Sequence, residues 1–170
     1  MVVPVSRRAA AGFSLIEVVI SSLLLMVIAL GVLPLFTQAA SSNEAGREYM
    51  LVSNFAKSRA EEYLQRAFNS PALTLTAGTQ LVVDEYYSAK TRTWVAGTAA
   101  DASIAGDTAM WTRTTTVRQF SISDMATPLP SSADPGTVHI KEITVDVRGV
   151  KLGALLGSGK QTTVRVLKTQ

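Results

Sequence analysis

The stretch Gly12-Phe13-Ser14-Leu15-Ile16-Glu17 opens an apolar run that continues from Val18 to Phe36. Glu17 is the only charged residue between Ala9 and Asn43. The 19 residues of the apolar run would span roughly 28 Å as a helix, close to the hydrocarbon thickness of a bilayer. The run therefore predicts one membrane-spanning helix with a single carboxylate near its start.

A short leader, residues 1–12, precedes this helix and contains Arg7 and Arg8. Basic residues beside an apolar helix hold that end in the cytoplasm. The chain after Phe36 is therefore expected outside the cytoplasm, with its C-terminal part in the periplasm if the membrane is an inner membrane.

Gly12-Phe13 followed by Ser-Leu-Ile-Glu resembles the cleavage and methylation signal of type IV prepilins and type II secretion pseudopilins. In that family a membrane aspartyl peptidase cuts after the glycine and then N-methylates the new first residue. The resemblance implies a cut between Gly12 and Phe13 and a methylated Phe13. It also implies four partners: the prepilin peptidase, other pilin subunits both major and minor, an inner-membrane assembly platform, and the lipid bilayer before assembly into a pilus at the cell surface.

Glu17 would be costly in this setting, because a lone carboxylate in an apolar span costs several kcal/mol unless it is protonated or paired. The resemblance implies a pairing in which Glu17 neutralises the N-terminal amine of a neighbouring subunit and so sets the register of assembly. The alternative is that Glu17 lies at the level of the lipid headgroups and reaches water.

Two other readings of the N-terminus remain open. A conventional signal peptide could be cut near Thr37-Gln38-Ala39-Ala40, but its apolar core is normally 7 to 15 residues, shorter than the 19 residues of this run. A plain single-span anchor is the second, and it leaves Gly12-Phe13 and Glu17 unexplained.

Gly31 and Pro34 interrupt the apolar run. Proline lacks an amide donor and clashes with the carbonyl four residues earlier, so a bend is expected between residues 29 and 34. A proline late in the apolar stretch also resembles many pilins.

The helical pattern continues over residues 37–69. An apolar stripe recurs at spacings of three, four and seven residues, at Tyr49, Val52, Ala56, Ala60, Tyr63 and Ala67. The helix should end near Phe68, because Pro71 disfavours helix at the residue before it.

Residues 70–170 read as a β-rich head. Strands are expected at 80–87, 91–95, 111–122, 138–148 and 160–168, with loops at 96–107 and 123–136. The last two strands should pair as an antiparallel hairpin, with Ile143, Val145 and Val147 on one face. The fold class is α+β, and the family resemblance implies the ladle-shaped pilin fold: a long bent N-terminal helix packed on an antiparallel sheet.

The segment containing Ala56, Ala60, Glu61 and Leu64 is similar to the helix of PilV-type minor pilins and of I-type minor pseudopilins. That similarity implies a subunit that initiates or caps the filament. The alternatives are a major pilin, a type II secretion pseudopilin, and a tip adhesin or DNA-uptake pilin. The last would need a basic surface strip around Arg113, Arg118, Lys141, Arg148 and Lys151.

No catalytic, metal or cofactor site is predicted. The chain has no cysteine, and its one histidine, His139, is expected to be an ordinary strand residue. Asp101 and Asp107 are more often solvated than bound to calcium, and Trp94 and Trp111 are expected in the core. Gly153, Gly157 and Gly159 fit a turn rather than a phosphate loop. The net charge of +3 includes two arginines that cleavage would remove, so it gives no argument for nucleic-acid binding. The chain is therefore expected to be a structural subunit and not an enzyme.

Overall fold

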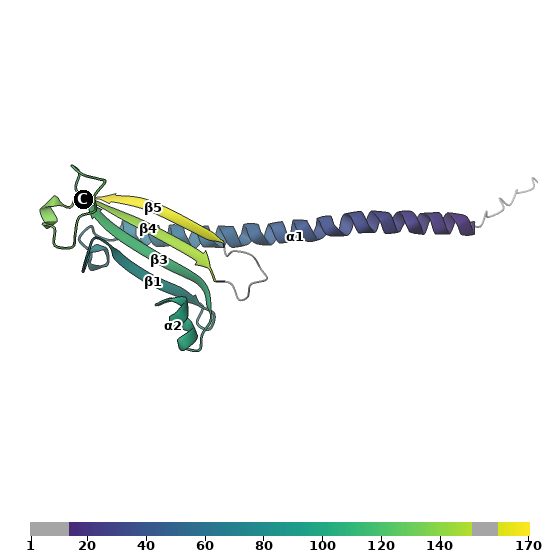
Figure 1. Cartoon of the computed structure of the whole chain (residues 1–170), viewed down its shortest axis with the longest axis horizontal. Helices are drawn as coiled ribbons and strands as arrows, with labels where there is room; N and C mark the ends of the chain where they lie inside the picture. Colours follow the sequence, from purple (N-terminus) through teal and green to yellow (C-terminus); the bar gives the residue numbers. More distant parts are fainter. Residues whose placement is uncertain (1–13, 151–159) are drawn as a thin grey trace, which may run out of the picture. The chain divides into compact units, whose positions relative to one another are not determined.

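The computed structural model describes residues 14–150 and 160–170. The chain divides into two compact units, residues 1–45 and 46–170. One helix, α1 (Leu15–Gln65, 51 residues), contributes to both units, and the sheet belongs to the second (Figure 1).

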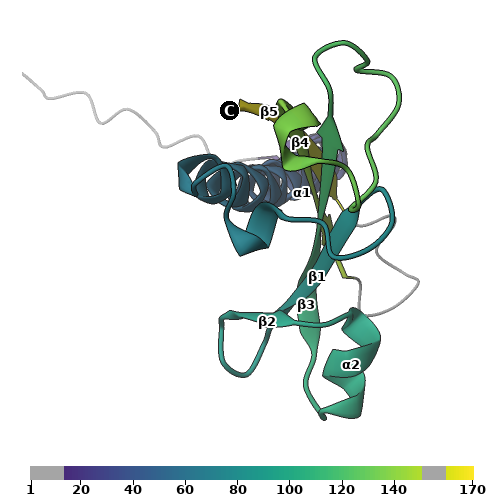
Figure 2. The same ribbon diagram turned by 90° about the vertical axis from the view of Figure 1, so that its left-hand side faces the viewer.

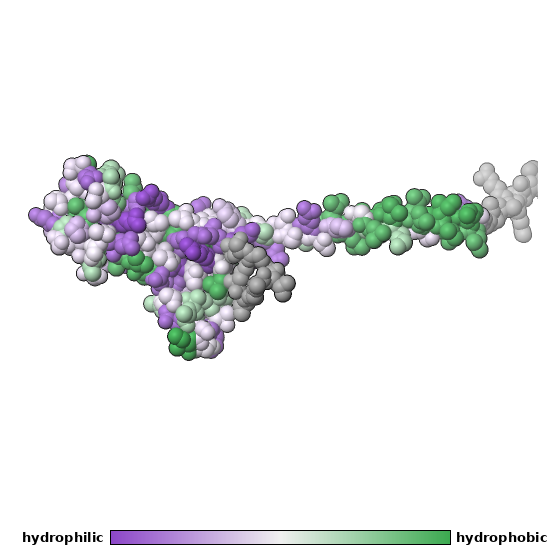
Figure 3. All heavy atoms as spheres, in the orientation of Figure 1, coloured by the Kyte–Doolittle hydropathy of each residue, from purple (hydrophilic) through white to green (hydrophobic). Residues whose placement is uncertain are grey.

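In the first unit, α1 is helical throughout, including at Gly31 and Pro34. Its large apolar side chains are exposed, and they colour this part of the helix green in Figure 3. The expected bend near Pro34 stays a prediction. The apolar surface has no partner within the described part of this unit.

The second unit contains a five-stranded antiparallel sheet in the order β2-β1-β3-β4-β5. Its strands are β1 (Leu81–Ser88), β2 (Trp94–Ala96), β3 (Ala109–Phe120), β4 (Ile140–Gly149) and β5 (Gln161–Thr169). The predicted final hairpin is confirmed, because β4 pairs antiparallel with β5 and Ile143 lies opposite Val166. Figure 2 shows α1 on one side of this sheet and the short helix α2 (Ala99–Ile104) on the other.

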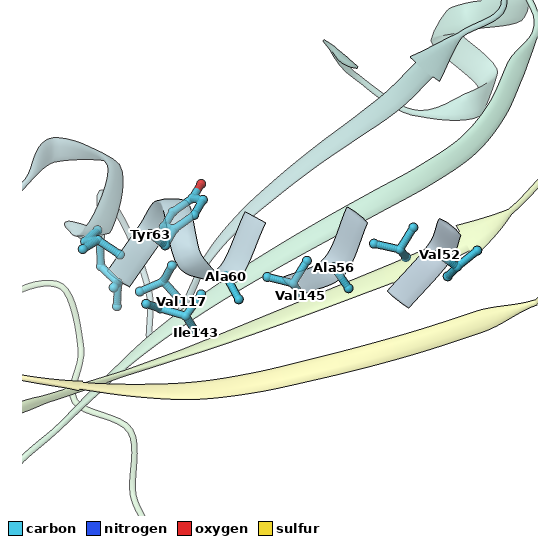
Figure 4. Packing of buried hydrophobic residues seen from close by; sticks show 10 residues of the cluster. Val52, Ala56, Ala60, Tyr63, Val117, Ile143 and Val145 are labelled. Carbon is cyan, nitrogen blue, oxygen red and sulfur yellow. The ribbon is translucent and has the colours of Figure 1, made fainter. Parts of the chain in front are cut away.

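The second part of α1 packs on the sheet through the predicted apolar stripe. Val52, Ala56, Ala60 and Tyr63 are buried there. They share one core with the buried strand residues Val117, Ile143, Val145 and Val147 (Figure 4). The two alanines carry only a methyl group each, which lets the helix backbone approach the sheet closely. An α+β fold with a long helix on an antiparallel sheet is thus confirmed.

The predicted apolar stripe was wrong at its two ends, Tyr49 and Ala67, which are not buried. Tyr49 is 55% exposed, and Ala67 is exposed beyond the end of α1. The helix stops at Gln65 rather than Phe68, because the chain turns there: the Ser70 amide donates to the Ala67 carbonyl at 3.0 Å. A short 3₁₀ helix, η1 (Pro71–Leu73), follows, and its Leu73 is buried in the core.

Two other predicted elements need correction. The second strand begins at Trp94 rather than Thr91, because Arg92 has a φ of 55° and the Ser88 amide bonds the Thr93 carbonyl to close a turn. Residues 99–104 form α2 where only a loop was expected. The carboxylate of Asp101 accepts from the Thr98 amide, and the Thr98 hydroxyl accepts from the Asp101 amide, which caps the helix. A second short 3₁₀ helix, η2 (Pro135–Thr137), lies in the predicted 123–136 loop.

The core predicts a stability contrast between two strand residues. Ile143 is fully buried beneath α1, and Leu167 is 54% exposed on the other face of the sheet. Ile143→Ala should lower the free energy of unfolding by about 2–5 kcal/mol, and Leu167→Ala by less than about 1 kcal/mol. Denaturant unfolding of the full chain in detergent micelles measures both. Equal losses would mean that the helix does not pack on that face.

Candidate functional site

Glu17 lies in the first turn of α1. The carbonyl of Ser14 accepts hydrogen bonds from the amides of Glu17 (3.0 Å) and Val18 (3.2 Å), so the helix begins immediately before the carboxylate. Negative charge at this end is favoured by the helix dipole. Glu17 is exposed, and no salt bridge to it is found among the described residues.

The helix around Glu17 is suited to an apolar medium. α1 contains an apolar window long enough to cross a membrane, and none of that window is buried within the chain. Two of its hydroxyl groups are bonded locally: Ser22 Oγ donates to the Val19 carbonyl at 2.9 Å, and Thr37 Oγ1 donates to the Pro34 carbonyl at 2.8 Å. Such bonds lower the cost of placing these hydroxyls in lipid.

Gly31 and Pro34 lie on this exposed helix. A Cβ added to Gly31 would meet no atom of the chain within 4 Å, so packing inside the chain does not require a glycine there. The Pro34 carbonyl accepts from Thr37, which returns one bond to a helix that proline weakens. Gly12 and Phe13, the predicted cleavage residues, lie outside the described residues.

A partly buried ion network joins α1 to the sheet in the second unit. The carboxylate of Glu85 accepts from Arg113 Nε at 2.9 Å and contacts Arg113 at 2.8 Å and Arg59 at 3.0 Å through their terminal nitrogens. Arg59 also pairs with Glu62, which pairs in turn with Arg66. Glu85 therefore holds two arginines, one from the helix and one from β3.

Aromatic rings surround this network. The Arg113 guanidinium lies 4.1 Å from the centre of the Trp94 ring, a cation–π contact. Phe55 and Tyr87 contact each other, and each contacts both Trp94 and Trp111, with ring centres 5.3–5.7 Å apart. Both tryptophans pack against the core, as predicted.

Two lysines from the sheet close the C-terminal end of α1. Lys141 Nζ donates to the Phe68 carbonyl at 2.8 Å, and Lys168 Nζ donates to the Leu64 carbonyl. The two lysines lie opposite each other on β4 and β5. Because the last turn of α1 has no basic residue of its own, the ammonium group of Lys168 supplies the positive charge that a helix C-terminus favours, while Lys141 holds the turn that follows the helix.

The basic strip required of a DNA-uptake protein is not assembled by the described residues. Arg113 and Lys141 are buried on the face beneath α1, whereas Arg118 and Arg148 point to the opposite face. Arg148 is paired with Asp146 at 3.0 Å. Lys151 lies outside the described residues. Alternation along the strands divides the basic residues between two faces.

The carboxylates of Asp101 and Asp107 accept hydrogen bonds from nearby residues. Asp101 caps α2, and Asp107 accepts from the Ser88 hydroxyl and from the amides of Lys90 and Thr108. These bonds lower the pKa of both carboxyl groups. No group of three or more potential metal-ligating side chains occurs in residues 14–150 and 160–170.

His139 immediately precedes β4, with its amide on the Phe120 carbonyl at 3.1 Å. The predicted turn glycines Gly153, Gly157 and Gly159 fall outside the described residues.

Sequence reasoning missed the Arg59–Glu85–Arg113 network. Arg59 lies one residue before the buried stripe position Ala60, and Arg113 lies on the same buried face of β3 as Thr115 and Val117. An arginine at an inward strand position was the available signal. Its partner could not be chosen, because Glu85 comes from another strand, 28 residues away.

Comparison with known families finds a match at the N-terminus of the chain. Residues 7–33 match the family model of the prokaryotic N-terminal methylation motif, the type IV pilin signature. No curated protein and no solved structure matches the chain. The matched range contains Gly12, Phe13 and Glu17, so the resemblance in the sequence is confirmed. The particular minor-pilin type is not.

Removing the charge of Glu85 should destabilise the second unit strongly. Glu85→Gln would leave Arg59 and Arg113 without their shared carboxylate, at a cost of about 3–5 kcal/mol in the free energy of unfolding. Glu62→Gln is the matched control, because the Glu62 side chain is 45% exposed and should cost less than about 1 kcal/mol. Denaturant titration of both variants tests the contrast, and a smaller loss for Glu85→Gln would contradict the network.

Lys141 should give stability a pH dependence in the alkaline range. Burial lowers the pKa of its ammonium group, and the charge of Lys168 adds to this. A folded pKa below the unfolded value means that the unfolded chain binds more protons, so the free energy of unfolding rises with pH. Relative to Lys141→Met, the unmodified chain should gain stability over the alkaline range below about pH 10.4, the ordinary pKa of a lysine in an unfolded chain. A constant difference across that range would contradict the lowered pKa.

Proposed function

We infer from the N-terminal methylation motif at residues 7–33 that the chain is a type IV pilin-like or pseudopilin precursor processed by prepilin peptidase. This signature marks structural, membrane-anchored subunits rather than enzymes. We propose that the chain is a minor pilin-like subunit of a type IV pilus, cut between Gly12 and Phe13 and methylated at Phe13. It waits in the inner membrane with residues 46–170 in the periplasm and then enters the filament, where it initiates or caps assembly.

The observation that carries this proposal is the exposed apolar surface of α1 between Leu15 and Phe36, with a carboxylate in the first turn of the helix. Exposed apolar surface of this extent requires either lipid or other subunits. The same surface serves both states, because helices leaving lipid can pack on one another in a filament. Gly31 supports close packing, since no atom of its own chain needs the space.

Glu17 gives the assembled state its register. In lipid the carboxylate lies near the membrane surface, and in the filament it would pair with the methylated amine of Phe13 in a neighbouring subunit. Each group offsets the cost of burying the other. An incoming subunit displaced along the axis would leave both groups unpaired.

A type II secretion pseudopilin is the alternative from the same signature. The similarity around Ala56, Ala60, Glu61 and Leu64 applies to both minor pilins and I-type pseudopilins. The tip adhesin or DNA-uptake alternative has less support, since the described basic residues are divided between the two faces of the sheet.

Neutralising Glu17 should separate processing from assembly. Glu17→Gln keeps the side chain's size and the cut site, so cleavage should continue while the amount in sheared filaments falls by about tenfold or more, as expected for an unpaired buried amine. Glu44→Gln, on an exposed part of the same helix, is the control and should assemble normally. Normal incorporation of Glu17→Gln would overturn the pairing.

The minor role predicts a low copy number. Quantitative mass spectrometry of sheared filaments should find this chain far below the major subunit, and its deletion should reduce the number of filaments. Abundance equal to the major subunit would identify a major pilin instead.

A further inference from the structure

The two edges of the sheet differ in how far they are protected. β2, at one edge, has three residues and leads directly to α2. β5, at the other, has nine residues, and no described strand pairs beyond it (Figure 1). A long unpaired edge strand is a template for another strand.

The register of β5 identifies which backbone groups face outward. The Gly149 amide donates to the Lys160 carbonyl, and Arg148 lies opposite Gln161. In an antiparallel pair, alternate residues bond the neighbouring strand, so the even-numbered residues of β5 bond β4. The amide and carbonyl groups of the odd-numbered residues therefore point to the open edge, at Gln161, Thr163, Arg165, Leu167 and Thr169.

β5 lacks two of the features that usually block an edge, proline and a β-bulge, although it carries Arg165 and Lys168. It contains no proline, and its pairing with β4 is regular over its whole length, whereas β1 and β3 show a register shift beside Tyr87. Its threonines, valines and leucine favour extended structure. The backbone is therefore shaped to accept a further strand.

The side chains define what kind of strand would fit. On the face toward α1, Val164 and Val166 are half-buried against the core, and Leu64 beside Lys168 is 38% exposed. An added strand would bury more of this apolar surface with apolar side chains. On the opposite face, the Arg165 side chain is 64% exposed although it contacts Glu142.

Charge favours an acidic partner. β5 and the residue before it contain Lys160, Arg165 and Lys168, and no acidic residue. Two copies of β5 paired over their full length would centre on Arg165 and place two guanidinium groups opposite each other. Like charges directly across a pair are destabilising, so the longest self-pairing is disfavoured.

We propose that the open edge of β5 binds an extended segment of another protein, which adds to the sheet as an antiparallel strand. The segment alternates apolar side chains toward α1 with acidic side chains beside Arg165. Backbone hydrogen bonds supply affinity, and the alternating side chains supply selectivity. The edge is part of the second unit, so binding does not depend on cleavage after Gly12.

A synthetic nine-residue peptide alternating glutamate and valine, with capped ends, is the probe. Added to the full chain in detergent micelles, it should slow hydrogen exchange at the amides of Thr163, Arg165 and Leu167. Thr163→Pro removes one outward donor and should weaken binding by about tenfold, whereas Thr163→Val keeps the amide and should bind within about twofold. Protection of the Val164 amide, which points to β4, reports whether the proline variant keeps its hairpin.

Charge reversal gives a test that does not depend on proline. Arg165→Glu should lose the glutamate peptide and gain a lysine–valine peptide of the same length. The proposal is overturned if the glutamate peptide leaves the three outward amides unprotected, or if Arg165→Glu does not change the preference. Protection of those amides by concentration alone, without peptide, would show self-pairing and would also overturn it.

Discussion

The apolar surface of α1 between Leu15 and Phe36 is the constraint on which the rest of the molecule depends. None of its large side chains finds cover within the described first unit. Removing apolar surface from water gains roughly 25 cal/mol of free energy per Å². This surface is therefore stable only where lipid or other subunits cover it. A single carboxylate, Glu17, interrupts that surface in the first turn. A carboxylate in that position must either pair with a positive charge or lie at the level of the lipid headgroups, where it reaches water.

The second half of the same helix is covered by the chain's own sheet. Val52, Ala56, Ala60 and Tyr63 are buried against the sheet, and Glu85 bridges Arg59 on the helix with Arg113 on β3. Lys168 on β5 bonds a carbonyl in the last turn of α1, and Lys141 on β4 bonds a carbonyl in the turn that follows. The head therefore holds its part of α1 by packing, by ion pairs and by capping. It does so without disulfides, since the chain has no cysteine.

Periodicity in the sequence predicted the elements that repeat over many residues: the long helix, its central stripe and the alternating strands of the final hairpin. Periodicity did not predict the short elements whose ends are set by a few local hydrogen bonds or by one backbone angle. The Thr98–Asp101 cap makes a helix within a polar loop, and the left-handed Arg92 shortens β2. The N-terminal signal was found because its residues are contiguous. The network around Glu85 was missed because its members come together only after the strands pair.

Intact mass and N-terminal sequencing of the membrane-expressed chain, with and without a prepilin peptidase, show whether its N-terminus is processed as proposed. The peptidase should yield a product beginning at methylated Phe13, and the full-length chain should accumulate without it. A product beginning near Ala40 or Ser41 would indicate an ordinary secreted domain. A chain that remains uncut beside active peptidase would leave a plain membrane anchor and contradict the account.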